Sequence, residues 1–77
     1  MSLLNYYLHP ESDSIILSAS HPGDTCEEIG PAALPLSVED FRLTWCIATL
    51  TPPPKHLMES AAYAIHNLDT FIQMRSR

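Results

Sequence analysis

The residues that could form a Ser-His-Asp triad are Ser18 or Ser20 with His21 and Asp24. A hydrolytic triad needs its histidine to be held by a buried third group beside an exposed nucleophile. Residues that neighbour one another on a polar loop rarely reach that geometry, and no nucleophile-elbow motif surrounds them. We therefore predict that the chain has no catalytic residue and is not an enzyme.

Two of these residues, His21 and Asp24, are also the best candidates for metal ligands, together with His9 and Cys26. His9, His21, Asp24 and Cys26 are ligand types, but the spacing His21-x-x-Asp24-x-Cys26 matches no recurring zinc pattern. Cys26 and Cys46 match no redox motif, and we expect two reduced thiols. The two glycines are isolated, so there is no glycine-rich phosphate loop. The sequence thus predicts no metal and no cofactor.

Charge is divided unevenly along the chain. Residues 1–41 contain seven Asp or Glu and no Lys or Arg, which gives −7. Residues 42–77 contain four bases and two acids, which gives +2, and the two parts sum to the net charge of −5. The acidic part should repel nucleic acid and anionic lipid and attract a basic protein surface. Solubility alone would also account for it.

Length and composition predict one small domain over residues 1–77. A chain of 77 residues leaves no room for a second domain or a deep cleft. The composition, 45% hydrophobic and 17% charged, is that of a globular protein. No run approaches the eighteen or so apolar residues of a membrane span. The first residues lack the basic start of a secretory signal, so we expect a cytoplasmic protein with no membrane partner.

Residues 2–20 carry the signals of a β-hairpin. Apolar residues recur at alternate positions in its first half, and the turn residues 10–13 precede a second β-rich run. Tyr6 and Tyr7 should point to opposite faces of the first strand, so we expect one of them to be exposed. Residues 21–36 contain Pro, Gly and three acids, and they predict a long acidic loop with at most a short helical turn.

Residues 37–50 allow two interpretations. As a strand, the segment alternates cleanly and places four apolar residues on one face: Phe41, Leu43, Trp45 and Ile47. As a helix, Ser37 would be the N-cap, with Asp40 three residues later in a motif close to a capping box. We favour the strand and keep the helix as the alternative. In both, we expect Trp45 to lie in the core.

Residues 54–75 predict a long helix. Pro54 suits the first helical position, and neither Gly nor Pro follows it. Apolar residues then recur at helical spacing: Leu57, Ala61, Ile65, Leu68 and Ile72. We expect this helix to cross a sheet and to supply much of the core. Its alanines could instead bring a second copy close, and exposed sheet edges offer another route to a homodimer.

These elements predict an α+β domain with a β-hairpin, a third antiparallel strand at 37–50 and a C-terminal helix on one face of the sheet. The alternative is a hairpin followed by two helices. Because no catalytic group emerges, we predict a non-catalytic protein-binding module, regulator or inhibitor. Such a chain would also suit a viral or mobile-element protein that blocks a host factor.

The predicted contact surface for the partner protein is the acidic stretch of Asp24, Glu27 and Glu28, with Tyr7 and Tyr63 as aromatic contacts. The partner should have a basic surface. One alternative function is an acidic mimic that occupies the DNA or RNA site of another protein. A second alternative is a small enzyme or metal site at a dimer interface.

Overall fold

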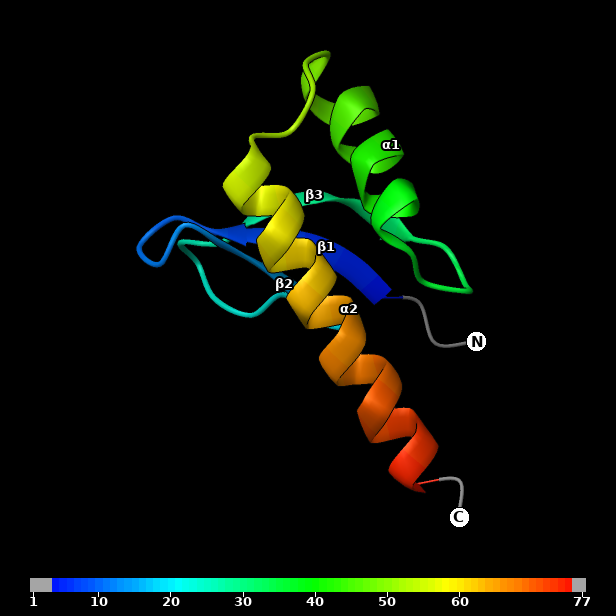
Figure 1. Cartoon of the computed structure of the whole chain (residues 1–77). Coiled ribbons are helices and arrows are strands. Elements are labelled where there is room, and N and C mark those ends of the chain that lie inside the picture. Colours follow the sequence, from blue (N-terminus) through cyan, green and yellow to red (C-terminus); the bar gives the residue numbers. More distant parts are fainter. Residues whose placement is uncertain (1–3, 76–77) are drawn as a thin grey trace.

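The computed structural model describes residues 4–75, and the side chains of residues 4–70. Within this range the chain forms one antiparallel sheet with strand order β2-β1-β3 and two helices (Figure 1). The elements are β1 (Leu4–His9), β2 (Ser14–Ser18), β3 (Glu27–Ala32), α1 (Val38–Thr49) and α2 (Lys55–Arg75). The predicted α+β class with three antiparallel strands is therefore confirmed.

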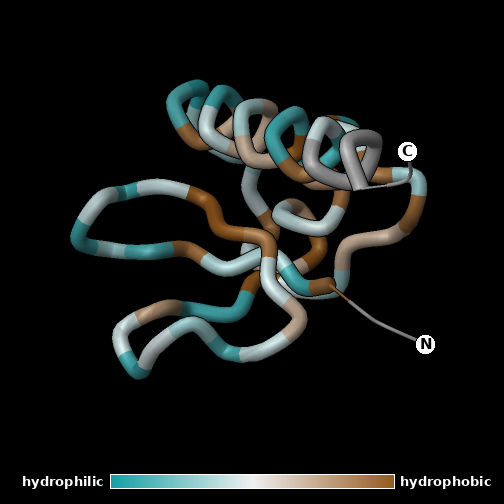
Figure 2. The backbone as a smooth tube through the Cα atoms, turned by 90° about the horizontal axis from the view of Figure 1, so that it is seen from below, coloured by the Kyte–Doolittle hydropathy of each residue, from teal (hydrophilic) through white to brown (hydrophobic). Residues whose placement is uncertain are grey.

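The core lies between one face of the sheet and the two helices. Alternate residues of β1 point into it, and Tyr6 and Phe41 are fully buried there. The Tyr6 and Phe41 rings meet edge to face, with centroids 5.3 Å apart, and Trp45 lies 6.0 Å beyond Phe41. Leu57 and Ala61 close the core from α2, whose hydrophobic side faces the strands in Figure 2. The prediction that Trp45 is a core residue is confirmed.

Residues 37–50 form a helix, so the preferred strand interpretation is wrong and the alternative is correct. Ser37 has an extended backbone, and its hydroxyl accepts a hydrogen bond from the amide of Asp40 at 3.0 Å. At the other end, Leu50 adopts a left-handed conformation, and its amide donates to the carbonyl of Cys46 at 2.8 Å. These caps satisfy backbone groups at the two ends of the helix. The alternating hydrophobic pattern, which favours a strand, carries no information about such caps.

The third strand lies instead at β3, inside the segment predicted to be an acidic loop. Its antiparallel pairing to β1 runs from Leu4↔Ala32 to Leu8↔Glu27, with a register shift between Tyr6 and Tyr7. Pro31 fits because β3 is an edge strand, where the missing amide of proline is tolerated. In place of the short helical turn expected near residues 25–29, the chain makes a tight turn, in which the amide of Cys26 donates to the carbonyl of Gly23 at 3.1 Å, and the strand follows at Glu27.

Both central tyrosines are buried, so the expectation that one would be exposed is wrong. Tyr7 points to the face opposite the helices and is only 3% exposed. The connection between β2 and β3 covers that face and lies on the other side of the strands from α2 in Figure 2. Its His21 ring lies edge to face against Tyr7 with centroids 5.2 Å apart, and Cys26 is buried as well.

The predicted C-terminal helix is α2. Its first residue is Lys55, and the carbonyl of Pro54 accepts the amides of Leu57 and Met58, both at 3.1 Å. Pro54 therefore stands just before the helix and not at its first position. In the next turn, the hydroxyl of Ser60 accepts the amide of Ile15 at 2.8 Å, which satisfies a backbone donor of the edge strand β2.

The close approach of α1 to β3 depends on Gly30. A Cβ atom at this position would lie 2.7 Å from the Cγ2 methyl of Thr44, which is closer than real Cβ contacts allow. The hydroxyl of Thr44 donates to the carbonyls of Asp40 and Pro31, at 2.9 and 3.4 Å. Thr44 is thus held against the strand and has little freedom to move away.

We predict that Gly30→Ala lowers the free energy of unfolding by about 1–3 kcal/mol, the usual cost of overpacking. Thr44→Ser removes the opposing methyl and keeps the hydroxyl, so the double variant should recover part of that loss. Urea denaturation of the two single variants and the double variant measures this coupling. Gly23→Ala is the matched control, because nothing lies within 4 Å of its added Cβ. Strictly additive effects of the two substitutions would contradict the contact.

Candidate functional site

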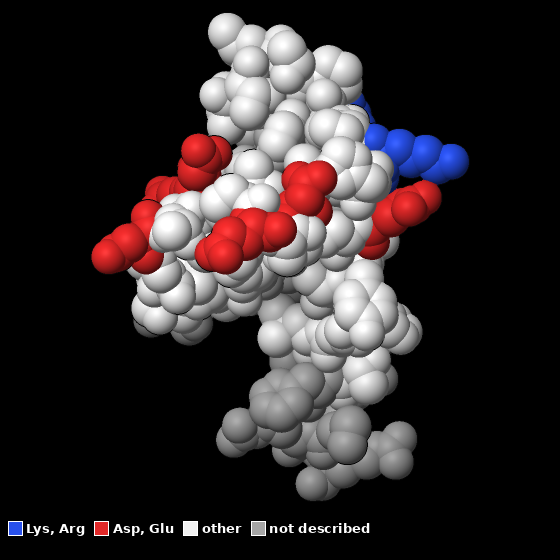
Figure 3. Space-filling view, turned by 90° about the vertical axis from the view of Figure 1, so that its left-hand side faces the viewer, with Lys and Arg blue, Asp and Glu red and all other residues white. Residues whose placement is uncertain are grey.

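The three predicted acidic residues lie at one end of the sheet. Glu27 and Glu28 begin β3, where they pair with the end of β1, and Asp24 lies in the turn before them. All three are exposed. The β1–β2 turn, which contains the exposed Glu11 and Asp13, reaches the same end because β2 begins where β1 stops. We call these five residues the acidic end, and Figure 3 shows acidic side chains spread across this side of the molecule.

The two predicted aromatic contacts have different surroundings. Tyr7 belongs to β1 beside the acidic end, but its ring is covered by His21 and cannot contact a partner in this conformation. Tyr63 is 70% exposed on α2. Tyr63 and the three acids are therefore accessible to a partner protein, whereas Tyr7 is buried and is not.

The acidic end is joined to α2 by one contact. His56 Nε2 lies 2.6 Å from Asp13 Oδ2, and both side chains are exposed. Asp13 has a left-handed backbone in the turn, a conformation that Asp tolerates better than most residues. The start of α2 therefore lies beside the acidic end.

The residues considered for a triad bond to the loop backbone. Ser18 Oγ donates to the carbonyl of Ser20 at 2.6 Å, and Nδ1 of His21 accepts the amide of Gly23 at 3.3 Å. In the part of the chain that the structure describes, no three His, Cys, Asp or Glu side chains come together as a metal site would require. Both cysteines are free thiols.

A second surface, not predicted from the sequence, lies on α1. Leu43, Ile47 and Leu50 are 50, 79 and 87% exposed and follow one another at positions i, i+4 and i+7. Helical spacing places Leu43 and Ile47 on the side of α1 opposite Phe41 and Trp45 in the core, and Leu50 is the C-cap residue just past the end of the helix. We call Leu43, Ile47 and Leu50 the outer stripe. The helix interpretation of residues 37–50 places Leu43 and Ile47 on the opposite side from Phe41 and Trp45. The strand interpretation places all four residues on one face, so it does not predict a second apolar surface.

One ion pair borders the outer stripe. The Arg42 guanidinium bonds both carboxylate oxygens of Glu39, one turn earlier on α1. This hydrogen bond lowers the pKa of the Glu39 carboxyl and raises the pKa of Arg42. Both groups are exposed enough for solvent to screen them, so the pair contributes little stability. It gives the stripe a polar margin.

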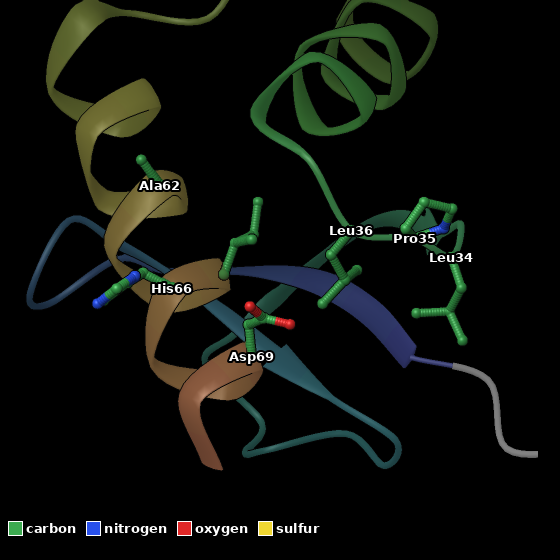
Figure 4. A pocket seen from close by; sticks show the side chains of 7 residues that line it. Leu34, Pro35, Leu36, Ala62, His66 and Asp69 are labelled. Atoms are coloured by element: carbon green, nitrogen blue, oxygen red, sulfur yellow. The ribbon is translucent and has the colours of Figure 1, made fainter. Parts of the chain in front are cut away.

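A shallow groove lies between α2 and the segment before α1. It has a volume of about 370 Å³ and is lined by Leu34, Pro35, Leu36, Ala62, Ile65, His66 and Asp69. In Figure 4 the side chain of Asp69 is directed toward Leu36, and that of His66 points away from the groove. The lining is mainly apolar, so this groove suits an apolar group better than a polar substrate.

Asp40 has a structural role, because its carboxylate accepts hydrogen bonds from two other parts of the fold. Its Oδ2 accepts the hydroxyl of Tyr6 at 2.7 Å and the amide of Ala33 at 3.1 Å. Burial of Tyr6 raises the pKa of its phenol above the ordinary value, and the hydrogen bond and negative charge of Asp40 raise it further. The neutral phenol is therefore the form that the folded state favours.

No protein-family model, curated protein or solved structure matches this chain. Among the described residues, neither helix combines the length and the apolar character needed to cross a bilayer. The outer stripe and the acidic end are therefore the two surface features from which a function can be inferred.

We predict that stability falls above about pH 10, the ordinary tyrosine pKa. Between that pH and the higher folded-state pKa of Tyr6, the folded state holds more protons than the unfolded state, so stability decreases as pH rises. One proton contributes a slope of up to about 1.4 kcal/mol per pH unit. Urea denaturation from pH 7 to 11 should show this slope reduced in Tyr6→Phe, which also loses about 1–2 kcal/mol at pH 7. Tyr63→Phe is the exposed control, and an equal slope in all three proteins would refute the assignment.

Proposed function

We propose that this chain is a non-catalytic protein-binding module, a regulator or inhibitor that acts through the outer stripe of α1. The observation that carries the proposal is the exposure of Leu43 and Ile47 on the outer side of α1, together with the exposed Leu50 at its C-cap. Their spacing matches the anchors that an amphipathic helix places in an apolar groove of a partner.

The free energy that burial of the outer stripe would contribute supports a binding role. Full burial of a Leu or Ile side chain contributes about 1.5–3 kcal/mol, which gives about 5–9 kcal/mol for the three residues. The part of this free energy that their present partial burial already supplies must be subtracted. The costs of association reduce this figure, and the remainder suits a specific but moderate affinity. In the isolated chain these side chains contribute little to the core, because they point away from it.

The acidic end gives the proposed module a second feature. Its five exposed acids would attract a partner whose groove is bordered by basic residues and would speed the encounter at low salt. A viral or mobile-element protein that blocks a host factor fits this description. A cytoplasmic location is part of the proposal, and the two free thiols support it.

A second candidate function is an acidic mimic of nucleic acid. The gathering of acids at one end of the sheet favours it, because a mimic must concentrate negative charge on one surface. The two candidates differ in what holds the partner. The stripe acts through apolar contact, which salt weakens little, and the mimic acts through charge, which salt screens.

The test is capture of the partner from lysate by tagged chains, read by mass spectrometry and followed by affinity measurement at low and high salt. We expect Ile47→Asp to weaken binding at least about tenfold, a loss of about 1.4 kcal/mol or more, because it places a charge in the apolar contact. Asn67→Asp is the matched control, since it adds the same charge at an exposed position on the other helix.

The double variant Glu27→Lys, Glu28→Lys separates the two candidate functions. Under the binding-module proposal it slows association and leaves most of the affinity at high salt. If that variant abolishes binding while Ile47→Asp leaves it intact, the mimic is correct and the outer stripe is not the contact surface.

A further inference from the structure

The connection between α1 and α2 has its backbone conformation dictated by its sequence, Thr51-Pro52-Pro53-Pro54. Each proline fixes its own φ near −65° and pushes the residue before it into the extended region. In residues 4–75 the only cis peptide bond is Leu34–Pro35, so the bonds before these three prolines are trans. Pro52 and Pro53 are therefore restricted to the polyproline II region, and Thr51 is restricted to the extended region.

Both ends of this connection are anchored. The amide of Thr51 donates to Oγ1 of Thr49 at 3.3 Å, and that hydroxyl also donates to the carbonyl of Trp45 at 2.9 Å. At the other end, the carbonyl of Pro54 accepts two amides from the first turn of α2. The connection is thus held in one shape by the two helices, and a partner would not need to order it.

The middle of the connection faces solvent. It stands at the top of Figure 1, at the end of the molecule opposite the C-terminal turns of α2. Pro52 and Pro54 are exposed and Pro53 is half-buried. No hydrogen bond from the described residues reaches the carbonyl oxygens of Pro52 or Pro53. Its neighbours Leu50 and Lys55 are exposed as well.

We propose that the segment 50–55 is a ligand for a domain that reads polyproline II helices through an aromatic-lined groove. Pyrrolidine rings pack against aromatic faces, and free proline carbonyls accept hydrogen bonds from Trp or Tyr side chains of such grooves. Because the segment is already in the bound conformation, little conformational entropy is lost on binding. Leu50 and Lys55 would supply an apolar and a charged contact at its two ends.

This inference rests on the proposed function and names the class of partner. Leu50 belongs to both the outer stripe and the proline segment, so the two surfaces are continuous along the chain. A partner that covers the end of α1 would therefore meet the prolines next.

The test uses isotope-labelled full chain titrated with a panel of isolated SH3, WW and EVH1 domains and followed by NMR. We expect at least one domain to bind with a Kd below about 1 mM and to shift the amide signals of Leu50, Thr51 and Lys55. The double variant Pro52→Ala, Pro53→Ala should weaken that binding at least about tenfold. A proline-rich peptide that binds the same domain should compete with the chain.

Pro22→Ala is the matched control, since it makes the same change at an exposed proline in another loop. Thermal unfolding of every variant verifies that the fold is retained. The inference fails if no domain shifts these signals at about 1 mM, or if the double proline variant binds as well as the unaltered chain.

The same variants separate this inference from the proposed function. A captured partner that is lost with Ile47→Asp but retained by the double proline variant leaves the binding module standing and refutes the proline segment as its contact. Domain binding that persists in Ile47→Asp and disappears in the double proline variant supports the proline segment even where the outer stripe fails.

Discussion

The carboxylate of Asp40 ties the central strand, the end of β3 and the start of α1 together. It accepts the Tyr6 hydroxyl and the Ala33 amide, and the amide of Asp40 is itself bonded to the N-cap Ser37. A charged acceptor makes these hydrogen bonds stronger than neutral ones. This junction sets the rotation of α1 about its own axis and places Phe41, the next residue, on the Tyr6 ring.

Once that rotation is set, both sides of α1 are determined. Phe41 and Trp45 enter the core, so Leu43 and Ile47 must face outward. A helix that packs only against the core of its own domain needs one apolar side, and its solvent-facing side is ordinarily polar. The second apolar row on α1 departs from that rule and contributes little to the isolated fold, which is why contact with another molecule is the economical explanation for it.

The sequence predicts the hairpin and α2 because their signals are local: alternation around a turn for one, and a helical repeat that starts after prolines for the other. It misplaces the third strand because Gly30 and Pro31 look like breakers, although an edge strand that closely approaches a helix accommodates both. In 37–50 the apolar residues satisfy both periods, and only the Ser37 cap distinguishes helix from strand. Burial of Tyr7 by His21 depends on how a distant loop folds back, which no local pattern encodes.

The outer stripe and the proline connection follow one another along the chain, and the acidic end contacts the start of the helix that comes next. Leu50 caps α1, the prolines follow after Thr51, and two residues after Pro54 the side chain of His56 contacts Asp13 of the acidic end. One partner could therefore touch an apolar centre and a charged margin together, which is the usual composition of a protein interface. The complementary surface would be an apolar, aromatic groove with a basic rim on the side of the acidic end. The proposed partner would account with one contact for the exposed apolar side of α1, the exposed prolines and the charge segregation of the chain.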